Sequence, residues 1–105
     1  IVITTHPLDA HSDHKVAAEI AEELRNKSNI KFDLYFALIH YRDYPPRGFI
    51  YPPKKLFSDR WFSFELNDFE VSIKKKALDE YSSQVRGYEK GWYMRFVAPN
   101  EIFEM

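Results

Sequence analysis

The alternation of apolar and polar positions along the chain predicts an α/β fold. Residues 1–5 and residues 32–39 are two short apolar runs, rich in β-branched or aromatic side chains, and each is typical of a buried strand. Between them, apolar residues recur at helical spacing over residues 12–27. A strand, a helix and a second strand form a crossover unit, so we expect the two strands to lie parallel.

The helix predicted over residues 12–27 has both a start signal and an apolar stripe. Ser12 or Asp13 can cap it, because a short polar side chain accepts hydrogen bonds from free N–H groups of the first turn. Charged side chains cover the opposite face. The apolar stripe that we expect to be buried consists of Val16, Ala17, Ile20, Ala21 and Leu24.

The second half of the chain predicts a long irregular segment and four further elements. Four of the six prolines lie in residues 41–60, and such a long irregular stretch inside a compact domain is usually functional or mobile. Asn67 and Glu70 have the spacing of a helix capping box. The elements expected after residue 60 are a strand over 61–66, a helix over 68–84, a strand over 92–97 and an extended piece over 100–105.

Composition narrows the class of protein. Of the 105 residues, 45% are hydrophobic and 17% aromatic, which is enough for a core. The net charge of -1 argues against a nucleic-acid partner, because nucleic-acid-binding domains are normally basic. No apolar run approaches the ~20 residues that cross a membrane. We therefore expect a cytoplasmic protein without nucleic-acid or membrane partners. Because Ile1 lies inside a predicted strand, we also expect the chain to be a fragment of a longer one.

Imidazole and carboxylate groups gather at the expected junction of the first strand and the first helix. Three of the four histidines and two aspartates lie in residues 5–14, and no cysteine is present to offer a thiolate. His11 and His14 are three positions apart at a helix start, so both rings can face one crevice. Zinc accepts such ligands, and Asp13 could fix the tautomer of a neighbouring histidine. The alternative is a capped helix with solvent-facing histidines.

Several residues outside this pair are further candidates for the same crevice. His40 ends the second predicted strand and points either at the crevice or into the packing. Arg42, and with it Arg47 of the same loop, could bind an anionic or sugar substrate, although loop arginines are often only solvated. His6 is either part of the loop structure or a residue that lines the site.

Several motifs in this order resemble the PIG-L (LmbE-like) zinc-dependent de-N-acetylases. Residues 9–15, Asp-Ala-His-Ser-Asp-His-Lys, followed by an alanine-rich helix, are similar to the second motif of that family, with Ser12 in place of its usual proline. The resemblance covers almost the whole chain. Its other parts are the strand end and loop at residues 39–45, the proline pair Pro52-Pro53, the helix signature at residues 74–84 and the C-terminal strand around residues 96–103.

The resemblance implies an α/β fold, namely the C-terminal part of a Rossmann-like α/β/α domain in which residues 1–105 belong to one deacetylase domain. It implies that the complete enzyme removes the acetyl group of an N-acetylglucosamine-type substrate with zinc as cofactor. His14 would be a zinc ligand, and His11 would stabilise the oxyanion or protonate the leaving amine. Asp13 would orient His11. The residues expected to contact the substrate are Asp9, His40 and Arg42.

One part of the family pattern is absent from these 105 residues. The first motif of the family, His-Pro-Asp-Asp-Glu, supplies two more zinc ligands and the general base, and no such run occurs here. We therefore expect this chain neither to hold zinc tightly nor to catalyse by itself. Two other readings stay open: a non-catalytic α/β binding or assembly module, and a different metal-dependent hydrolase completed by a partner chain. Homo-oligomerisation through an exposed strand edge is a further expectation.

Overall fold

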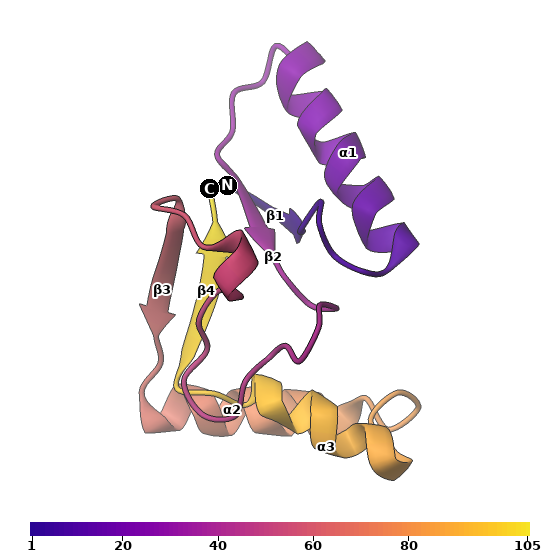
Figure 1. The fold of residues 1–105 in the computed structure, drawn as a ribbon, viewed down its shortest axis with the longest axis vertical. Helices are drawn as coiled ribbons and strands as arrows, with labels where there is room; N and C mark the ends of the chain where they lie inside the picture. The colour runs from indigo at the N-terminus through magenta and orange to yellow at the C-terminus, as the bar shows by residue number, and fades with distance from the viewer. The chain divides into compact units, whose positions relative to one another are not determined.

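The computed structural model describes the backbone of residues 1–105 and every side chain except that of Tyr88. Across this described chain the fold is mixed α/β, with four strands and three α-helices (Figure 1). The strands and α-helices are β1 (Val2–Thr5), α1 (Ser12–Lys27), β2 (Leu34–Ala37), β3 (Trp61–Glu65), α2 (Asp68–Glu80), α3 (Lys90–Tyr93) and β4 (Asn100–Glu104). Three short 3-10 helices are η1 (Lys54–Leu56), η2 (Gly87–Glu89) and η3 (Met94–Phe96).

The four strands form one mixed sheet in the order β1-β2-β4-β3. β1 and β2 are parallel, with Val2 opposite Leu34 and Thr5 opposite Ala37. This confirms the predicted crossover, because α1 connects the two strands. β4 pairs antiparallel to β2, with Phe36 opposite Glu104.

The first helix has the predicted length but a different cap and a different buried face. Its N-cap is His11, whose ring accepts a hydrogen bond from the backbone N–H of Asp13, so the prediction of Ser12 or Asp13 as cap was wrong. The helix packs through Ala18 and Ala21, and the core cluster consists of Ala18, Ala21, Leu34 and Phe36 with Phe32 against it. Of the predicted buried stripe, only Ala21 is buried, and Val16, Ala17, Ile20 and Leu24 are instead exposed.

β1 is also more exposed than a buried strand. It lies at the end of the sheet with a partner on one side only, and Val2 and Ile3 are exposed to 37% and 58%. The β-branched pattern therefore identified the strand correctly but overstated its burial. β2 is shorter than predicted, and its burial alternates, with Leu34 and Phe36 in the core.

The second half matches the pattern at its start and departs from it later. β3 forms as predicted, and Asn67 and Glu70 make the capping box in front of α2, which ends at Glu80 instead of residue 84. The strand predicted over residues 92–97 was wrong, because Trp92 and Tyr93 belong to α3 and Met94–Phe96 form η3. Trp92 and Phe96, four positions apart, contact edge to face with ring centroids 5.2 Å apart, a spacing that favours a helical turn.

The chain divides into two compact units. Unit 1 contains Ile1–Tyr44, Pro52–Phe62 and Ile102–Met105, and unit 2 contains Pro45–Tyr51 and Ser63–Glu101. Within the described residues, no helix combines the length and the apolar character that crossing a membrane requires. The histidines and their surroundings all belong to unit 1.

Candidate metal centre

Three segments of unit 1 converge where the parallel strands β1 and β2 end. These are the loop that follows β1, the first turn of α1 and the residues that follow β2. Beyond the strands the backbones stay paired, because Ala10 N–H donates to the carbonyl of His40 at 2.6 Å. The hydroxyl of Thr5 donates to the carbonyl of His14 at 2.7 Å and ties the end of β1 to the helix start. In α/β folds, the carboxyl ends of parallel strands are where ligands commonly bind.

Asp9 holds the convergence together from inside. Its side chain is fully buried, and Oδ1 accepts the backbone N–H of His11 at 3.0 Å. Oδ2 accepts the backbone N–H groups of Ile39 at 2.9 Å and of His40 at 2.8 Å. One carboxylate therefore fixes the helix-start loop against the segment after β2, and it still presents Oδ1 to the neighbouring imidazoles.

The rings of His14 and His40 complete a three-donor group around Asp9 Oδ1. The Nδ1 atom of His14 lies 3.0 Å from Asp9 Oδ1, and that of His40 lies 3.6 Å from it. The two Nδ1 atoms are 3.5 Å apart. In a tetrahedral zinc site with bonds of ~2.0–2.1 Å, the ligand atoms are ~3.3 Å from one another. The three donors thus fit the edges of one face of such a tetrahedron, and Asp9, His14 and His40 could hold a metal ion.

The charge states of this group also suit a metal ion. Burial raises the pKa of Asp9, but three backbone N–H groups and the nearby His14 outweigh it, so the pKa falls below its ordinary 3.8. For His40, burial lowers the pKa, Asp9 raises it, and His14 and His11 lower it further, so the pKa lies below 6.5. At neutral pH the group therefore offers an ionised carboxylate and a neutral imidazole, which are the forms that bind metals.

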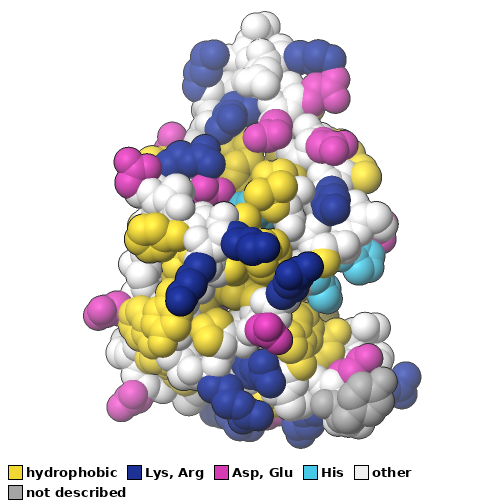
Figure 2. Space-filling model, viewed as in Figure 1, with side chains coloured by type: hydrophobic (Ala, Val, Ile, Leu, Met, Phe, Trp, Pro, Cys, Tyr) yellow, Lys and Arg dark blue, Asp and Glu magenta, His cyan; other side chains and the backbone are white. Residues whose placement is uncertain are grey.

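His11 lies beside the group without joining it. Its ring centroid is 4.9 Å from that of His14 and 5.6 Å from that of His40. Its Nδ1 accepts the Asp13 backbone N–H at 3.3 Å, so in the neutral ring the proton belongs on Nε2. The side chain is exposed, and histidine side chains reach the surface on the face shown in Figure 2. Nε2–H is therefore available to donate to a bound molecule.

The remaining predicted residues have other surroundings. Asp13 contacts His11 through its backbone N–H, whereas its carboxylate accepts a hydrogen bond from the Ser12 hydroxyl at 3.4 Å. His6 is 2% exposed and pairs with Glu104 Oε2 at 2.7 Å, so it is part of the packing. Arg42 is exposed in the segment after His40.

From the sequence we expect His14 as a ligand and Asp9 and His40 as substrate contacts, whereas the structure brings all three together. The local signal for Asp9 was present: an aspartate whose side chain bonds the N–H two residues later forms an Asx-turn at a helix start. Its bonds to Ile39 and His40 join residues 30 and 31 positions away, which no local pattern records.

Comparisons of the chain with protein-family models, with curated proteins and with solved structures gave no match.

Proposed function

We propose that this chain carries a zinc centre formed by Asp9, His14 and His40, and that the centre serves a de-N-acetylase of the PIG-L type. The single observation that carries the proposal is the triangle of donors, with one carboxylate oxygen and two imidazole nitrogens 3.0–3.6 Å apart. Hydrolytic zinc sites usually have three protein ligands and one open position. When bound, zinc would polarise an acetyl carbonyl and lower the pKa of water.

The residues of the chain divide the remaining tasks. Asp9 holds both loops in place, and the neutral ring of His40 and the ring of His14 present their Nδ1 atoms to the same point. His11 Nε2–H faces solvent beside this point, where it would donate to the oxygen that becomes negative during amide hydrolysis. The substrate class that we propose, an N-acetylglucosamine-type acetamide, rests on the motif resemblance together with this arrangement.

The proposal assigns residues 1–105 to the C-terminal part of a Rossmann-like deacetylase domain. The parallel β1 and β2 with α1 between them are compatible with that assignment. In this proposal Asp9 and His40 take the place of the two zinc ligands that the resemblance assigns to the first motif of the family, so the chain would hold zinc without that motif, contrary to the expectation from the sequence. The general base that deprotonates water would still come from that motif, which these residues do not contain. Binding of zinc and hydrolysis are therefore separable, and each has its own test.

Zinc binding is tested by titrating the metal-free chain in a calorimeter and measuring metal content after dialysis. We expect one zinc per chain in the wild type and a loss of affinity of at least about 100-fold in Asp9→Asn, His14→Ala and His40→Ala. His11→Ala is the matched control, because it removes a ring 4.9 Å from His14 that is not a ligand. Unchanged zinc affinity in His40→Ala would contradict the three-donor centre.

Hydrolysis is tested in the longest natural form of the protein by measuring acetate release from an N-acetylglucosamine conjugate. His11→Ala should lower the rate about 100-fold while leaving the zinc content unchanged. Zinc binding without any acetate release, even in that form, would favour the binding or assembly module and reject the enzymatic part of the proposal.

A further inference from the structure

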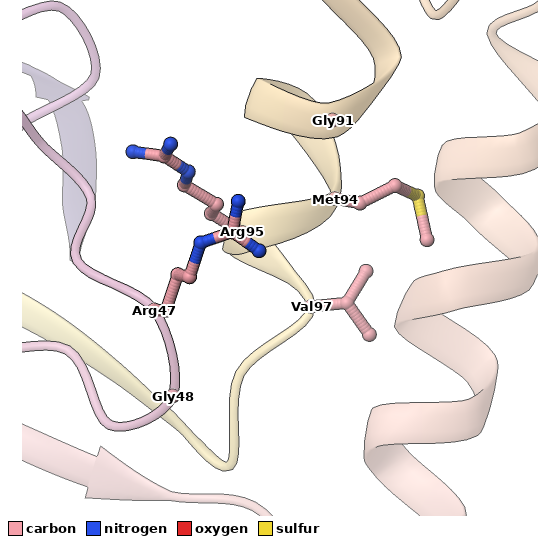
Figure 3. A pocket seen from close by; sticks show the side chains of 6 residues that line it. All are labelled: Arg47, Gly48, Gly91, Met94, Arg95 and Val97. Atoms are coloured by element: carbon pink, nitrogen blue, oxygen red, sulfur yellow. The ribbon is translucent and has the colours of Figure 1, made fainter.

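Unit 2 contains a small cavity with two arginines in its lining. The cavity has a volume of about 210 Å³, opens to solvent, and is lined by Arg47, Gly48, Gly91, Met94, Arg95 and Val97 (Figure 3). Drug-sized ligands occupy pockets of ~300–1,000 Å³, so this one suits a smaller molecule. No acidic side chain occurs among these described lining residues, and the lining therefore carries two positive charges.

The two guanidinium groups lie on the same side of η3. In Figure 3 the side chains of Arg47 and Arg95 extend to one side of the ribbon, whereas those of Met94 and Val97 point to the other. The wall next to the arginines is thus made mainly of glycine and backbone. Such a wall leaves room for a ligand to approach both guanidinium groups closely.

Arg47 lies in a loop whose two ends are buried. Pro45 and Ile50, which flank the loop tip, are fully buried, whereas Arg47 is exposed. The buried side chain of Asn100 accepts the N–H of Ile50 at 2.8 Å and donates to its carbonyl at 2.8 Å. Gly48 has φ +84°, a left-handed conformation that turns the chain at the tip. The backbone that carries Arg47 is therefore held in place before any ligand binds.

The guanidinium of Arg95 is incompletely hydrogen-bonded. Its Nε atom is buried and has no hydrogen-bond acceptor among the described residues. A buried donor without an acceptor is unfavourable, and a second cation lining the same cavity adds repulsion. A bound anion would offset the repulsion between the two cations.

We propose that Arg47 and Arg95 form a binding site for a phosphate group, independent of the zinc centre. Guanidinium groups bind phosphate through paired N–H···O bonds, and a phosphate dianion balances the two charges of the lining, which a single carboxylate does not. The cavity admits a free phosphate or the phosphate end of a small monoester.

The test is a calorimetric titration of the whole chain at constant ionic strength with inorganic phosphate, methyl phosphate, acetate and chloride. We expect one phosphate per chain, with acetate and chloride at least about tenfold weaker. Tighter binding of methyl phosphate than of phosphate would identify the natural ligand as a monoester, and the reverse would identify free phosphate. Equal binding of acetate and phosphate would overturn the proposal.

Three variants locate the site. Arg47→Ala and Arg95→Lys should each weaken phosphate binding at least about tenfold, since the first removes one fork and the second replaces a fork by a point charge. Arg86→Ala is the matched control, because Arg86 is an exposed arginine of the same unit outside the cavity lining. Equal loss of binding in Arg86→Ala would show general charge attraction and reject the site. Circular dichroism establishes that each variant is folded, and Arg47, being exposed, can be changed without disturbing the core.

Discussion

Unit 1 contains two clusters in which a buried carboxylate meets imidazole, and they differ in how far solvent reaches the imidazoles. In one, Glu104 pairs with His6 through Oε2, and its Oε1 accepts from Ser58 at 3.1 Å and from Arg60 at 2.7 Å. In the other, Asp9 faces the rings of His14 and His40.

The Glu104 cluster is closed. The second ring nitrogen of His6 accepts the backbone N–H of Leu8 at 3.0 Å, and the ring stacks on Trp61 with centroids 5.5 Å apart. Both carboxylate oxygens and both ring nitrogens are therefore in use. Such a cluster stabilises the packing and has no position left for an ion.

The Asp9 cluster has an open side. The side chains of His14 and His40 are exposed to 23% and 37%, and their Nδ1 atoms share one carboxylate oxygen at metal-ligand spacing. Proximity of histidine and carboxylate therefore does not by itself define a metal site. What distinguishes the two clusters is whether solvent reaches the imidazoles around the carboxylate.

The largest change in the free energy of unfolding should come from removing the carboxylate of the closed cluster. Glu104→Ala leaves a buried imidazole N–H and the Ser58 hydroxyl without their acceptor, and we expect a loss of about 3 kcal/mol in the free energy of unfolding. Urea denaturation measures it. Glu65→Ala, at an exposed position of β3, should change the same quantity by less than about 0.5 kcal/mol. A small effect of Glu104→Ala would mean that the closed cluster does not support the fold.

The next largest change in the free energy of unfolding should come from zinc binding at the open cluster. Free zinc at about 100 times its dissociation constant should raise the free energy of unfolding by about 2.7 kcal/mol, because the ion binds the folded chain. The increase should vanish in His14→Ala and persist in Glu104→Gln. Equal loss of zinc stabilisation in variants of both clusters would show that the Asp9 cluster is not the specific metal site.

Acid should act on the closed cluster with a defined sign. Burial raises the pKa of Glu104, but the hydrogen bonds of His6 and Ser58 and the charge of Arg60 outweigh it, so the folded pKa lies below its ordinary 4.5. The unfolded state then binds more protons, and the stabilisation is complete above about pH 4.5 and is lost as the pH falls through the folded pKa. Unfolding midpoints measured between pH 6 and pH 3 should fall less steeply in Glu104→Gln than in the wild type.

The smallest effect should come from the outer partner of Glu104. Arg60 is 64% exposed, so its ion pair is screened by water, and Arg60→Gln should cost about 0.5 kcal/mol. A loss as large as that of Glu104→Ala would show that the arginine, rather than His6, carries the closed cluster. Urea denaturation at low and high salt separates the two cases, because only the exposed pair weakens with salt.

Local signals predicted much of the fold. The helix over residues 12–27, the parallel strands around it and the capping box of Asn67 and Glu70 all depend on short-range spacing, and the structure has them. The strand predicted over residues 92–97 was wrong because a short aromatic run fits either element, and packing between Trp92 and Phe96 decides for a helix.

The candidate site could be read from the sequence only in part. The sequence indicated its helical ligand, His14, and the neighbouring His11, because these two residues lie within one turn. The part played by Asp9 depends on backbone groups about 30 residues away, and the pairing of His6 with Glu104 spans 98 positions. The exposure of Val16 and Ile20 likewise follows from α1 packing through two alanines, which spacing alone does not choose.

The sequence separation of the two imidazoles has a consequence for what a bound ion would join. His14 and His40 are 26 positions apart, and between them lie almost all of α1 and the whole of β2. An ion held by both would join the two ends of that loop in the folded chain for as long as it stays bound. A chelator would then remove the ion and, with it, the link between the two ends of the crossover segment.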